Sequence, residues 1–364
     1  MSAVWILGGT GRVGRAVADR LLADGTPAVL VGRDAARLDA AAAGRGHRTH
    51  VAAAPEAVAA GIREARPAVV VNTVGPFTRT APAVVDACLA AGSDYVDLAN
   101  DLAAVTALLD RGEDAVRAGR TLVTGAGFGV VATESVVAWL CDGTQQAVRV
   151  RTDMLPSLAV QAGPLGEALA GTLVEGLPGV PGGGRFSGRR VVDGCLAPAP
   201  LGGAVRSLVT PDGDRLSTGL MPLGELVAAQ RASGAPSVES ASSEVPTGRA
   251  VRTVLPLAAR LLAIGPLRRL AARRLAAVTF VERPAPRAHS WGHAVVTWAD
   301  GATSEGWLRL GEAQATTDAV AAEVVRRLVE GEGRPGAFTP VALLGTGLAE
   351  AVGGVYRRTD AGRP

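Results

Sequence analysis

The sequence contains no lysine, so arginine supplies all 37 of its basic residues. This absence excludes a P-loop lysine, a lysine Schiff base and the Tyr-x-x-x-Lys proton relay of short-chain dehydrogenases. Aromatic residues are also scarce, at 3%, and the formal net charge is only +3. No basic stripe is interleaved with aromatic residues, and we therefore expect no nucleic acid partner.

The three cysteines lie far apart, at Cys88, Cys141 and Cys195, and match neither a disulfide framework nor a metal motif. His289 and His293 are four residues apart but have no third ligand nearby, so we expect proton donors here and no metal site. The N-terminus shows no signal-peptide pattern, and no apolar run is long enough to span a membrane. The sequence predicts a cytoplasmic protein with free thiols and no stable membrane insertion.

Apolar runs and helix-period segments alternate over residues 1–147, and the runs expected to form strands are 3–7, 28–31, 50–52, 68–72, 94–98 and 121–125. This alternation predicts a Rossmann-type, doubly wound parallel sheet of the α/β class, with ligands bound over the carboxyl ends of the strands. From residue 148 onward, strand-like segments alternate apolar and polar residues and are separated by glycine-rich turns. They predict a second α+β domain with a largely antiparallel sheet.

A G-x-G-x-x-G pattern, Gly9-Thr10-Gly11-Arg12-Val13-Gly14, lies between the first expected strand and a helix-period segment. In a dinucleotide-binding fold the first glycine makes a tight turn and the second lets the backbone approach the pyrophosphate. The third packs the helix against the strand. We expect these six residues to bind a cofactor, together with those of a later strand end: Asn72, Thr73, Val74 and Gly75.

Arg33 follows the second expected strand, where an acidic residue would bind the ribose 2′-hydroxyl of NAD. An arginine at this position accommodates the 2′-phosphate of NADP, so the sequence predicts NADP(H) as the cofactor. Asp34 comes one residue later and is suited to cap the helix expected over residues 35–43.

Further motifs lie at strand ends and beyond them: Asn72-Thr73-Val74-Gly75-Pro76-Phe77, Asp94-Tyr95-Val96-Asp97-Leu98, Gly127-Phe128, and the segments 231–234, 283–288 and 334–340. With the glycine loop, they resemble the saccharopine dehydrogenase-like (saccharopine reductase) family, and within it the trans-acting enoyl reductase-like branch. The resemblance implies a Rossmann domain over 1–147, a substrate and dimerisation domain over 148–333, and a C-terminal segment, 334–364, that packs back on the first domain. It also implies nicotinamide-dependent reduction by a homodimer.

Two segments depart from the pattern of this family. Many members have Thr-Gly-Glu where this chain has Ala99-Asn100-Asp101, and Gly-Phe-Asp-Ser where it has Gly127-Phe128-Gly129-Val130. The second departure replaces an aspartate and a serine with glycine and valine. We therefore expect a less polar pocket floor and an apolar or bulky substrate.

Hydride transfer needs a proton donor opposite the cofactor. Asp101 is the first candidate for a general acid and Asn100 for an orienting donor, although Asp101 is equally suited to cap a helix that starts at Leu102. Phe77, Phe128 and Gly129 are the candidates for the substrate pocket, and either phenylalanine is equally plausible as core packing.

The segment 252–274 is apolar and rich in arginine. It fits an amphipathic helix that touches a membrane or a lipidic substrate, or a solvated arginine face on a helix packed against its own domain, which is the commoner case.

The sequence as a whole favours an NADPH-dependent oxidoreductase of secondary metabolism. Its expected reaction is reduction of a C=C or C=N bond in an apolar or polyketide-like small molecule, with carrier or coenzyme A linkage as an option. The alternative is a non-redox protein that retains the fold: a cofactor-bound cyclase or isomerase, or a nucleotide-sensing protein.

Overall fold

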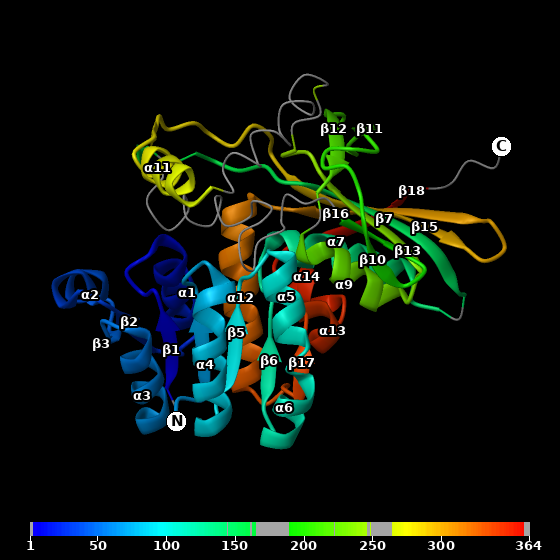
Figure 1. Cartoon of the computed structure of the whole chain (residues 1–364). Helices are drawn as coiled ribbons and strands as arrows, with labels where there is room; N and C mark the ends of the chain where they lie inside the picture. Colours follow the sequence, from blue (N-terminus) through cyan, green and yellow to red (C-terminus); the bar gives the residue numbers. More distant parts are fainter. Residues whose placement is uncertain are drawn as a thin grey trace. The chain divides into compact units, whose positions relative to one another are not determined.

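The computed structural model describes residues 3–143, 145–160, 162–164, 189–221, 223–245, 248 and 264–359 (Figure 1). The chain divides into two compact units. The first unit comprises Met1–Ala99, Ala104–Gly127 and Ala315–Leu348, and the second comprises Asn100–Ala103, Phe128–Gln314 and Ala349–Pro364. Both units are therefore discontinuous in sequence, and the expected domain boundaries after residues 147 and 333 stay a prediction.

The first unit contains a parallel sheet of seven strands in the order β17-β6-β5-β4-β1-β2-β3. These strands are β1 (Val4–Leu7), β2 (Ala28–Gly32), β3 (Arg48–Val51), β4 (Val69–Asn72), β5 (Asp94–Asp97), β6 (Thr121–Val123) and β17 (Gly336–Phe338). The strand order reverses between β1 and β4, which is the point where ligands bind in doubly wound sheets. The predicted Rossmann-type α/β class is confirmed.

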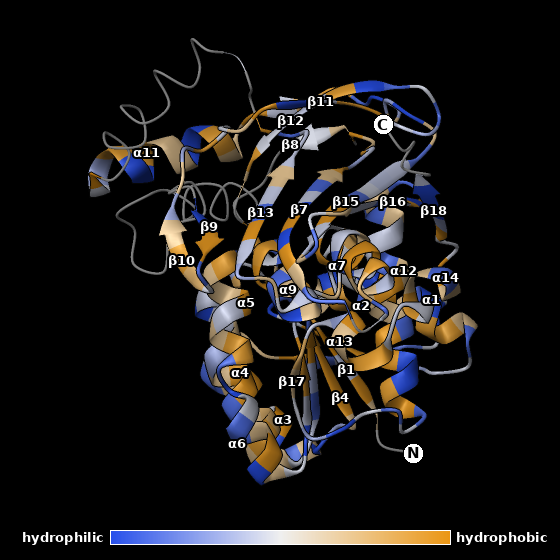
Figure 2. Cartoon of the chain, turned by 90° about the vertical axis from the view of Figure 1, so that its right-hand side faces the viewer, coloured by the Kyte–Doolittle hydropathy of each residue, from blue (hydrophilic) through white to orange (hydrophobic). Residues whose placement is uncertain are grey.

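Helices connect the strands of the first unit: α1 (Arg12–Ala23), α2 (Ala35–Ala42), α3 (Pro55–Ala65), α4 (Phe77–Ala91), α5 (Leu102–Leu109) and α6 (Gly112–Ala118), with α12 (Ala313–Val329) and α13 (Pro340–Leu344) near the end of the chain. Strands β1 and β4 are buried along their whole length, because helices cover both faces of the sheet (Figures 1 and 2).

The second unit is built on a mixed sheet. Its main path is β10-β9-β13-β7-β15-β16-β18, and the hairpin of β11 and β12 pairs with β13. The strands are β7 (Ala147–Leu155), β9 (Arg189–Val192), β10 (Cys195–Pro198), β11 (Arg206–Val209), β12 (Arg215–Leu220), β13 (Ser237–Ser242), β15 (Ser290–Trp298), β16 (Thr303–Leu310) and β18 (Val355–Thr359). Only β13 and β7 run parallel among the pairs of this sheet that the structure describes, so the largely antiparallel prediction is confirmed.

Helix α7 (Phe128–Leu140) packs on this sheet, with α9 (Gly224–Ser233) beside it. The close packing needs a glycine on β15, because a Cβ at Gly292 would overlap the carbonyl of Ala132. Helix α7 begins at Phe128. Its first turn is rich in valine, which favours strands, but the whole turn is buried and tertiary packing outweighs that propensity.

Three smaller elements complete the description: α11 (Gly265–Ala276), the two-stranded sheet of β8 (Gly163–Pro164) and β14 (Thr279–Phe280), and α14 (Gly347–Ala351). Among the described helices, none combines the length and the hydropathy needed to cross a bilayer.

Candidate active site

The glycine loop follows β1 and forms a tight turn. Gly8 has a φ of +80°, and the N–H groups of Gly8 and Gly9 both donate to the carbonyl of Val31 on β2, at 3.0 and 3.1 Å. Gly11 N–H donates back to the carbonyl of Gly8 at 2.8 Å. The backbone of the loop is thus anchored to the neighbouring strand and to itself.

Two of the loop glycines have no room for a side chain. A Cβ on Gly9 would lie 2.7 Å from Cβ of Leu30, and one on Gly14 would lie 2.5 Å from the carbonyl oxygen of Gly8. Gly9 therefore lets the loop lie against β2, and Gly14 lets α1 approach the loop. These are the packing roles expected of the glycine pattern.

Helix α1 starts directly after the loop, and its first intrahelical bond is Arg15 N–H to the Gly11 carbonyl, at 3.1 Å. The N–H groups of the first turn have no hydrogen-bond acceptor within the helix, and the first turn contains no acidic side chain. Gly11 and Arg12 are exposed. A backbone cradle of this kind, at a helix N-terminus, fits the pyrophosphate of a dinucleotide.

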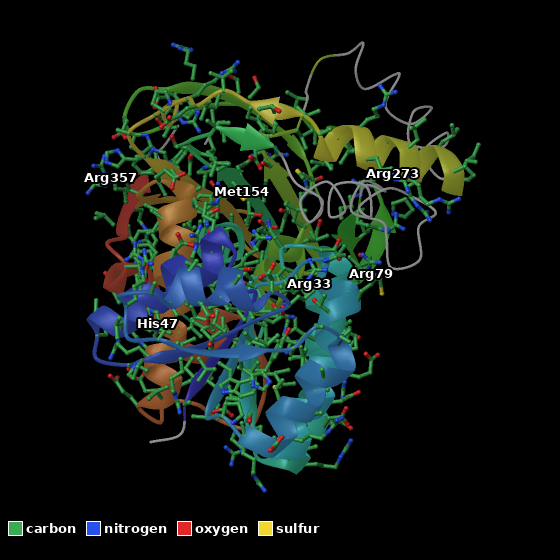
Figure 3. All side chains as sticks on the ribbon, turned by 90° about the vertical axis from the view of Figure 1, so that its left-hand side faces the viewer. Arg33, His47, Arg79, Met154, Arg273 and Arg357 are labelled. Atoms are coloured by element: carbon green, nitrogen blue, oxygen red, sulfur yellow. The ribbon has the colours of Figure 1, made fainter. Side chains whose placement is uncertain are left out.

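Arg33 is exposed at the end of β2, and its side chain is labelled in Figure 3. The following residue, Asp34, caps α2, since its carboxylate accepts the N–H of Arg37 at 3.0 Å. The capping role expected for Asp34 is confirmed. Arg33 thus lies at the strand end where, in sites of this type, an arginine accommodates the 2′-phosphate of NADP.

The loop after β4 is held from inside the sheet. Asn72 is buried, accepts the N–H of Val74 at 3.0 Å, and donates to Thr80 Oγ1 and to the Tyr95 hydroxyl, both at 3.2 Å. The Thr73 hydroxyl donates to the carbonyl of Leu7 on β1 at 2.7 Å. The side chains of Asn72 and Thr73 thus position the predicted cofactor-binding loop, and their contact with the cofactor stays a prediction.

A buried carboxylate organises the neighbouring strand ends. Asp97 accepts hydrogen bonds from the Ala99 N–H at 3.0 Å, the Thr124 hydroxyl at 2.8 Å, the Tyr95 hydroxyl at 3.0 Å and the Gly125 N–H at 3.3 Å. Burial raises the pKa of Asp97, and these neutral donors lower it by a smaller amount. Asp97 is therefore a structural centre that fixes the chain directly before Asn100.

Asn100 and Asp101 belong to the second unit, although they follow β5 in the chain. Asp101 precedes the first residue of α5 and forms an isolated bridge with Leu223, and the Gly224 N–H donates to the Asn100 carbonyl at 3.0 Å. The backbone of the two candidate catalytic residues is thereby fastened to the start of α9. Their catalytic roles stay predictions.

Glu225, in the first turn of α9, is the functional candidate that the sequence did not reveal. Its side chain is buried, with 1% of the residue exposed, and its two carboxylate oxygens lie 3.0 and 3.2 Å from the terminal amide atom of Asn100 that best fits its nitrogen, as a hydrogen-bond donor. Because the amide nitrogen of Asn100 faces this carboxylate, the amide oxygen faces the opposite way. In this orientation the N–H of Asn100 is used by Glu225, and the expected role of Asn100 as an orienting donor stays a prediction.

Glu225 also overturns the expectation of a less polar pocket floor at Gly129. A Cβ on Gly129 would overlap Glu225 Oε1, and would lie 3.0 Å from both the Asn100 amide and the sulfur of Met154. Gly129 leaves room for a carboxylate that comes from α9. Phe128, the other candidate of this segment, is buried at the start of α7, whereas Phe77 is half-buried at the start of α4.

The two histidines that were weighed as a metal pair have separate partners. His289 lies 2.7 Å from Asp212, and the buried His293 lies 3.1 Å from Asp153 and 3.0 Å from Glu305. Burial opposes the charged form of His293, but the two carboxylates outweigh it and raise the pKa of His293. Among the described residues no group of three ligand side chains could hold a metal ion.

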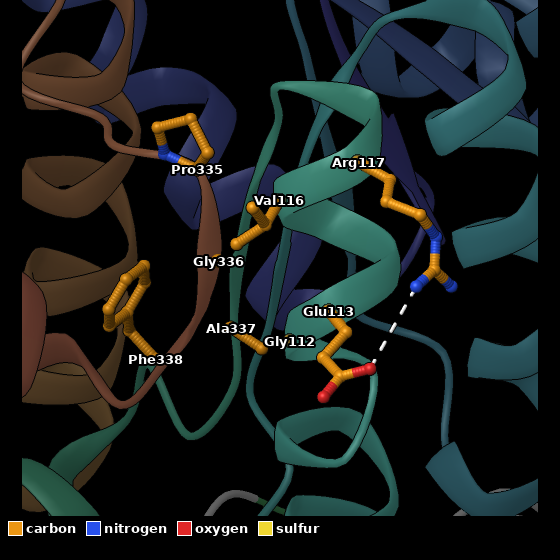
Figure 4. Close-up of a pocket in the computed structure, with 8 residues that line it drawn as sticks. All are labelled: Gly112, Glu113, Val116, Arg117, Pro335, Gly336, Ala337 and Phe338. Carbon is orange, nitrogen blue, oxygen red and sulfur yellow. Dashed lines mark ion pairs between the residues drawn. The ribbon is translucent and has the colours of Figure 1, made fainter.

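The first unit contains one further feature, an open apolar pocket of about 550 Å³ between α6 and β17 (Figure 4). Val116, Pro335 and Phe338 contribute to its lining, and the Glu113–Arg117 ion pair lies at its margin. No residue of the glycine loop or of the loop after β4 lines it. We therefore do not assign the substrate to this pocket.

Comparison with known proteins supports the cofactor assignment. Residues 4–123 match the family model of the saccharopine dehydrogenase NADP binding domain. A search of curated proteins gives no match. Among solved structures, saccharopine dehydrogenase (L-Glu forming) from Saccharomyces cerevisiae shares 15% identity at a TM-score of 0.59, over 99% of this chain and 100% of that chain.

The WlbA (WbpB) dehydrogenase from Thermus thermophilus, solved with NAD and alpha-ketoglutarate, shares 14% identity at a TM-score of 0.43, over 97% of this chain and 94% of that chain. At such identities the likeness to the yeast enzyme shows the fold, and the family model is what identifies the cofactor. The first unit thus carries a saccharopine dehydrogenase-type NADP-binding domain, and the chain is an NAD(P)-dependent oxidoreductase.

Proposed function

We propose that the protein uses NADPH to reduce a carbon–nitrogen double bond in a small molecule. The observation that carries this proposal is the buried carboxylate of Glu225 against the Asn100 amide. Asn100 follows β5 by three residues in the chain. A carboxylate that is shielded from water attracts a cation strongly. A protonated C=N group is cationic, whereas a C=C bond is neutral.

The residues divide the work as follows. The glycine loop and the first turn of α1 bind the pyrophosphate, Arg33 binds the 2′-phosphate, and the loop Asn72–Gly75 borders the nicotinamide side. When bound, NADPH supplies the hydride that reaches the carbon of the double bond. Asp101 gives its proton to the nitrogen of the neutral imine, which makes the C=N group cationic, and Glu225 stabilises that positive charge and orients Asn100. Hydride addition to the carbon would then neutralise the charge and leave an amine, and Asp101 would regain its proton from solvent.

The closest competitor is reduction of a C=C bond in a polyketide-like substrate, with or without a carrier or coenzyme A. Its main support was an apolar floor at Gly129, and the carboxylate of Glu225 removes that support. The non-redox alternatives would leave NADPH unconsumed. Homodimer formation through the second domain and the enoyl reductase-like branch stay predictions.

The test measures NADPH oxidation with a panel of cyclic imines and a panel of enoyl thioesters. We expect turnover with imines, and we expect Glu225→Gln to lower kcat/KM for imines about a hundredfold while the Kd for NADPH stays unchanged. Asp101→Asn should lower kcat in the same way. Glu113→Gln, at a side chain that is 95% exposed, is the matched control.

Turnover of enoyl thioesters but not of imines would overturn the C=N assignment. An unchanged kcat/KM in Glu225→Gln would return Glu225 to a structural role. An unchanged kcat in Asp101→Asn would leave Asp101 with only a structural role at the start of α5. NADPH that binds without being consumed by either panel would favour the non-redox alternatives.

A further inference from the structure

We propose that helix α11 and the strand after it form a docking surface for membranes that contain anionic lipids. The surface, called here the α11 surface, runs from Ile264 to Val281. No residue of α11 is buried, although six of its residues are leucine or alanine with the potential to pack. The alternative of an arginine-rich helix packed against its own domain is therefore not what the described part of the chain shows.

Exposed apolar side chains are concentrated on this surface. Leu267 is 43% exposed, Leu270 54% and Val281 74%. Seven of the 16 exposed large hydrophobic residues among the described residues lie within it: Ile264, Leu267, Leu270, Leu275, Val278, Phe280 and Val281. Single exposed apolar residues are ordinary on a protein surface, but a contiguous group marks an interaction site.

The apolar residues of α11 also share one side of the helix. Leu267, Leu270, Ala271 and Leu275 follow the spacing i, i+3, i+4, i+8, which places them along one face. Arg268, Arg269 and Arg273 lie beside and opposite this face, whereas Arg274, seven residues after Leu267, lies on it. Figure 3 shows Arg273 on the helix. Figure 2 shows polar and apolar segments in alternation along α11. Arginine side chains at such positions extend their charged ends to the level of lipid headgroups.

The charge of the α11 surface indicates which partner would bind there. Between Ile264 and Val281 the chain contains the four arginines Arg268, Arg269, Arg273 and Arg274 and no acidic residue. A second copy docked through the same surface would bring arginine against arginine, which is repulsive. An anionic bilayer satisfies both features, since it attracts the arginines and offers an apolar layer to the leucines.

The length of α11 fixes the mode of binding. Twelve residues of helix are too few to cross a bilayer, and the helix carries four arginines. The surface would therefore lie in the plane of the headgroups and bind reversibly. This interaction is separate from reduction, because it uses no residue of the cofactor or catalytic machinery.

The experiment is co-sedimentation of the full chain with vesicles of phosphatidylcholine, of phosphatidylglycerol, and of an equal mixture. We expect binding that grows with the phosphatidylglycerol content and weakens as sodium chloride is added. The double variant Arg273→Gln, Arg274→Gln should lower the partition coefficient about 25-fold, at about fivefold for each arginine. The double variant Leu267→Ser, Leu270→Ser should lower it at least about tenfold.

The matched control is Arg48→Gln, Arg63→Gln, which removes the same charge from two exposed arginines of the first unit. It should bind vesicles like the unchanged protein, and all variants should keep the Kd for NADPH. Equal binding to both pure lipids, an equal loss in the control, or no binding at all would overturn the proposal. So would binding to polyglutamate as strong as to vesicles, or dimer formation that the leucine variant abolishes without any vesicle binding.

Discussion

Asp97 and Asp153 both lie buried on central strands, Asp97 on β5 of the first unit and Asp153 on β7 of the second. Asp97 is surrounded by neutral donors, all from residues close to strand ends of its own sheet. Asp153 faces the charged side chains of Arg151, at 3.0 Å, and His293, at 3.1 Å, and accepts the Thr218 hydroxyl at 2.6 Å.

Burial alone would raise the pKa of both carboxyl groups, yet the two move in opposite directions. Burial prevails at Asp97, whose pKa is raised. At Asp153 the hydrogen bond and charge of His293, with the charge of Arg151, outweigh burial and lower the pKa to about 2. Neutral donors are thus enough to hold a turn in place, whereas a cation is needed to keep a buried carboxyl group ionised. The buried carboxyl group has neutral hydrogen-bond donors in the first sheet and charged partners in the second. We therefore expect the stability of the two units to respond differently to substitutions that remove charge.

The substitution Asp153→Asn tests this difference most strongly. It leaves Arg151 buried without its closest carboxylate and His293 with one partner fewer, so we expect a loss of about 3–5 kcal/mol in the free energy of unfolding. Asp97→Asn keeps an acceptor among neutral donors, and its loss should be about 1–3 kcal/mol. Urea denaturation followed by tryptophan fluorescence reports mainly on the second unit, which holds Trp139, Trp291, Trp298 and Trp307. Equal losses in the two variants would break the comparison.

The first unit should be sensitive to shape where the second is sensitive to charge. In Gly14→Ala the new Cβ would lie 2.5 Å from a backbone oxygen that is fixed by the turn. We expect a loss of about 1–3 kcal/mol in stability and a weakening of NADPH binding by about tenfold or more. Gly347→Ala is the matched control, since a Cβ there meets nothing within 4 Å. Fluorescence titration with NADPH measures the Kd of both variants. An unaffected Kd in Gly14→Ala would refute the assigned role of the loop.

The same contrast explains how far the sequence could be interpreted. The turn geometry of the glycine loop and the cap at Asp34 were predictable because each depends on residues a few positions away and on one neighbouring strand, whereas the role of Arg33 stays a prediction. Glu225 was not predictable, since its partner Asn100 lies in a distant part of the chain and a glutamate in the first turn of a helix is ordinary. The contact of His293 with Asp153 joins residues 140 apart. No spacing rule reports such contacts.

Arg33→Ala tests charge where the first unit does use it, at the surface that meets the cofactor. We expect the Kd for NADPH to rise about tenfold, or about 1.4 kcal/mol, with no change for NADH, because only NADPH carries the 2′-phosphate. Arg37→Ala removes a nearby exposed arginine and is the control. A parallel loss of NADH affinity would assign Arg33 to the shape of the loop instead of to phosphate recognition.

The pH dependence of stability gives the smallest and sharpest distinction. His293 has a pKa raised above its ordinary value of 6.5, so the stability that its charged form contributes is complete below that pH and is lost as pH rises through the folded-state pKa. We expect the second unit to lose about 1 kcal/mol between pH 6 and pH 9, measured as the shift in urea midpoint. His293→Gln should remove this loss while leaving the profile of the first unit unchanged. Should the variant keep the slope, the charge on His293 would not be what holds Asp153 ionised, and Arg151 alone would account for the low pKa of that carboxyl group.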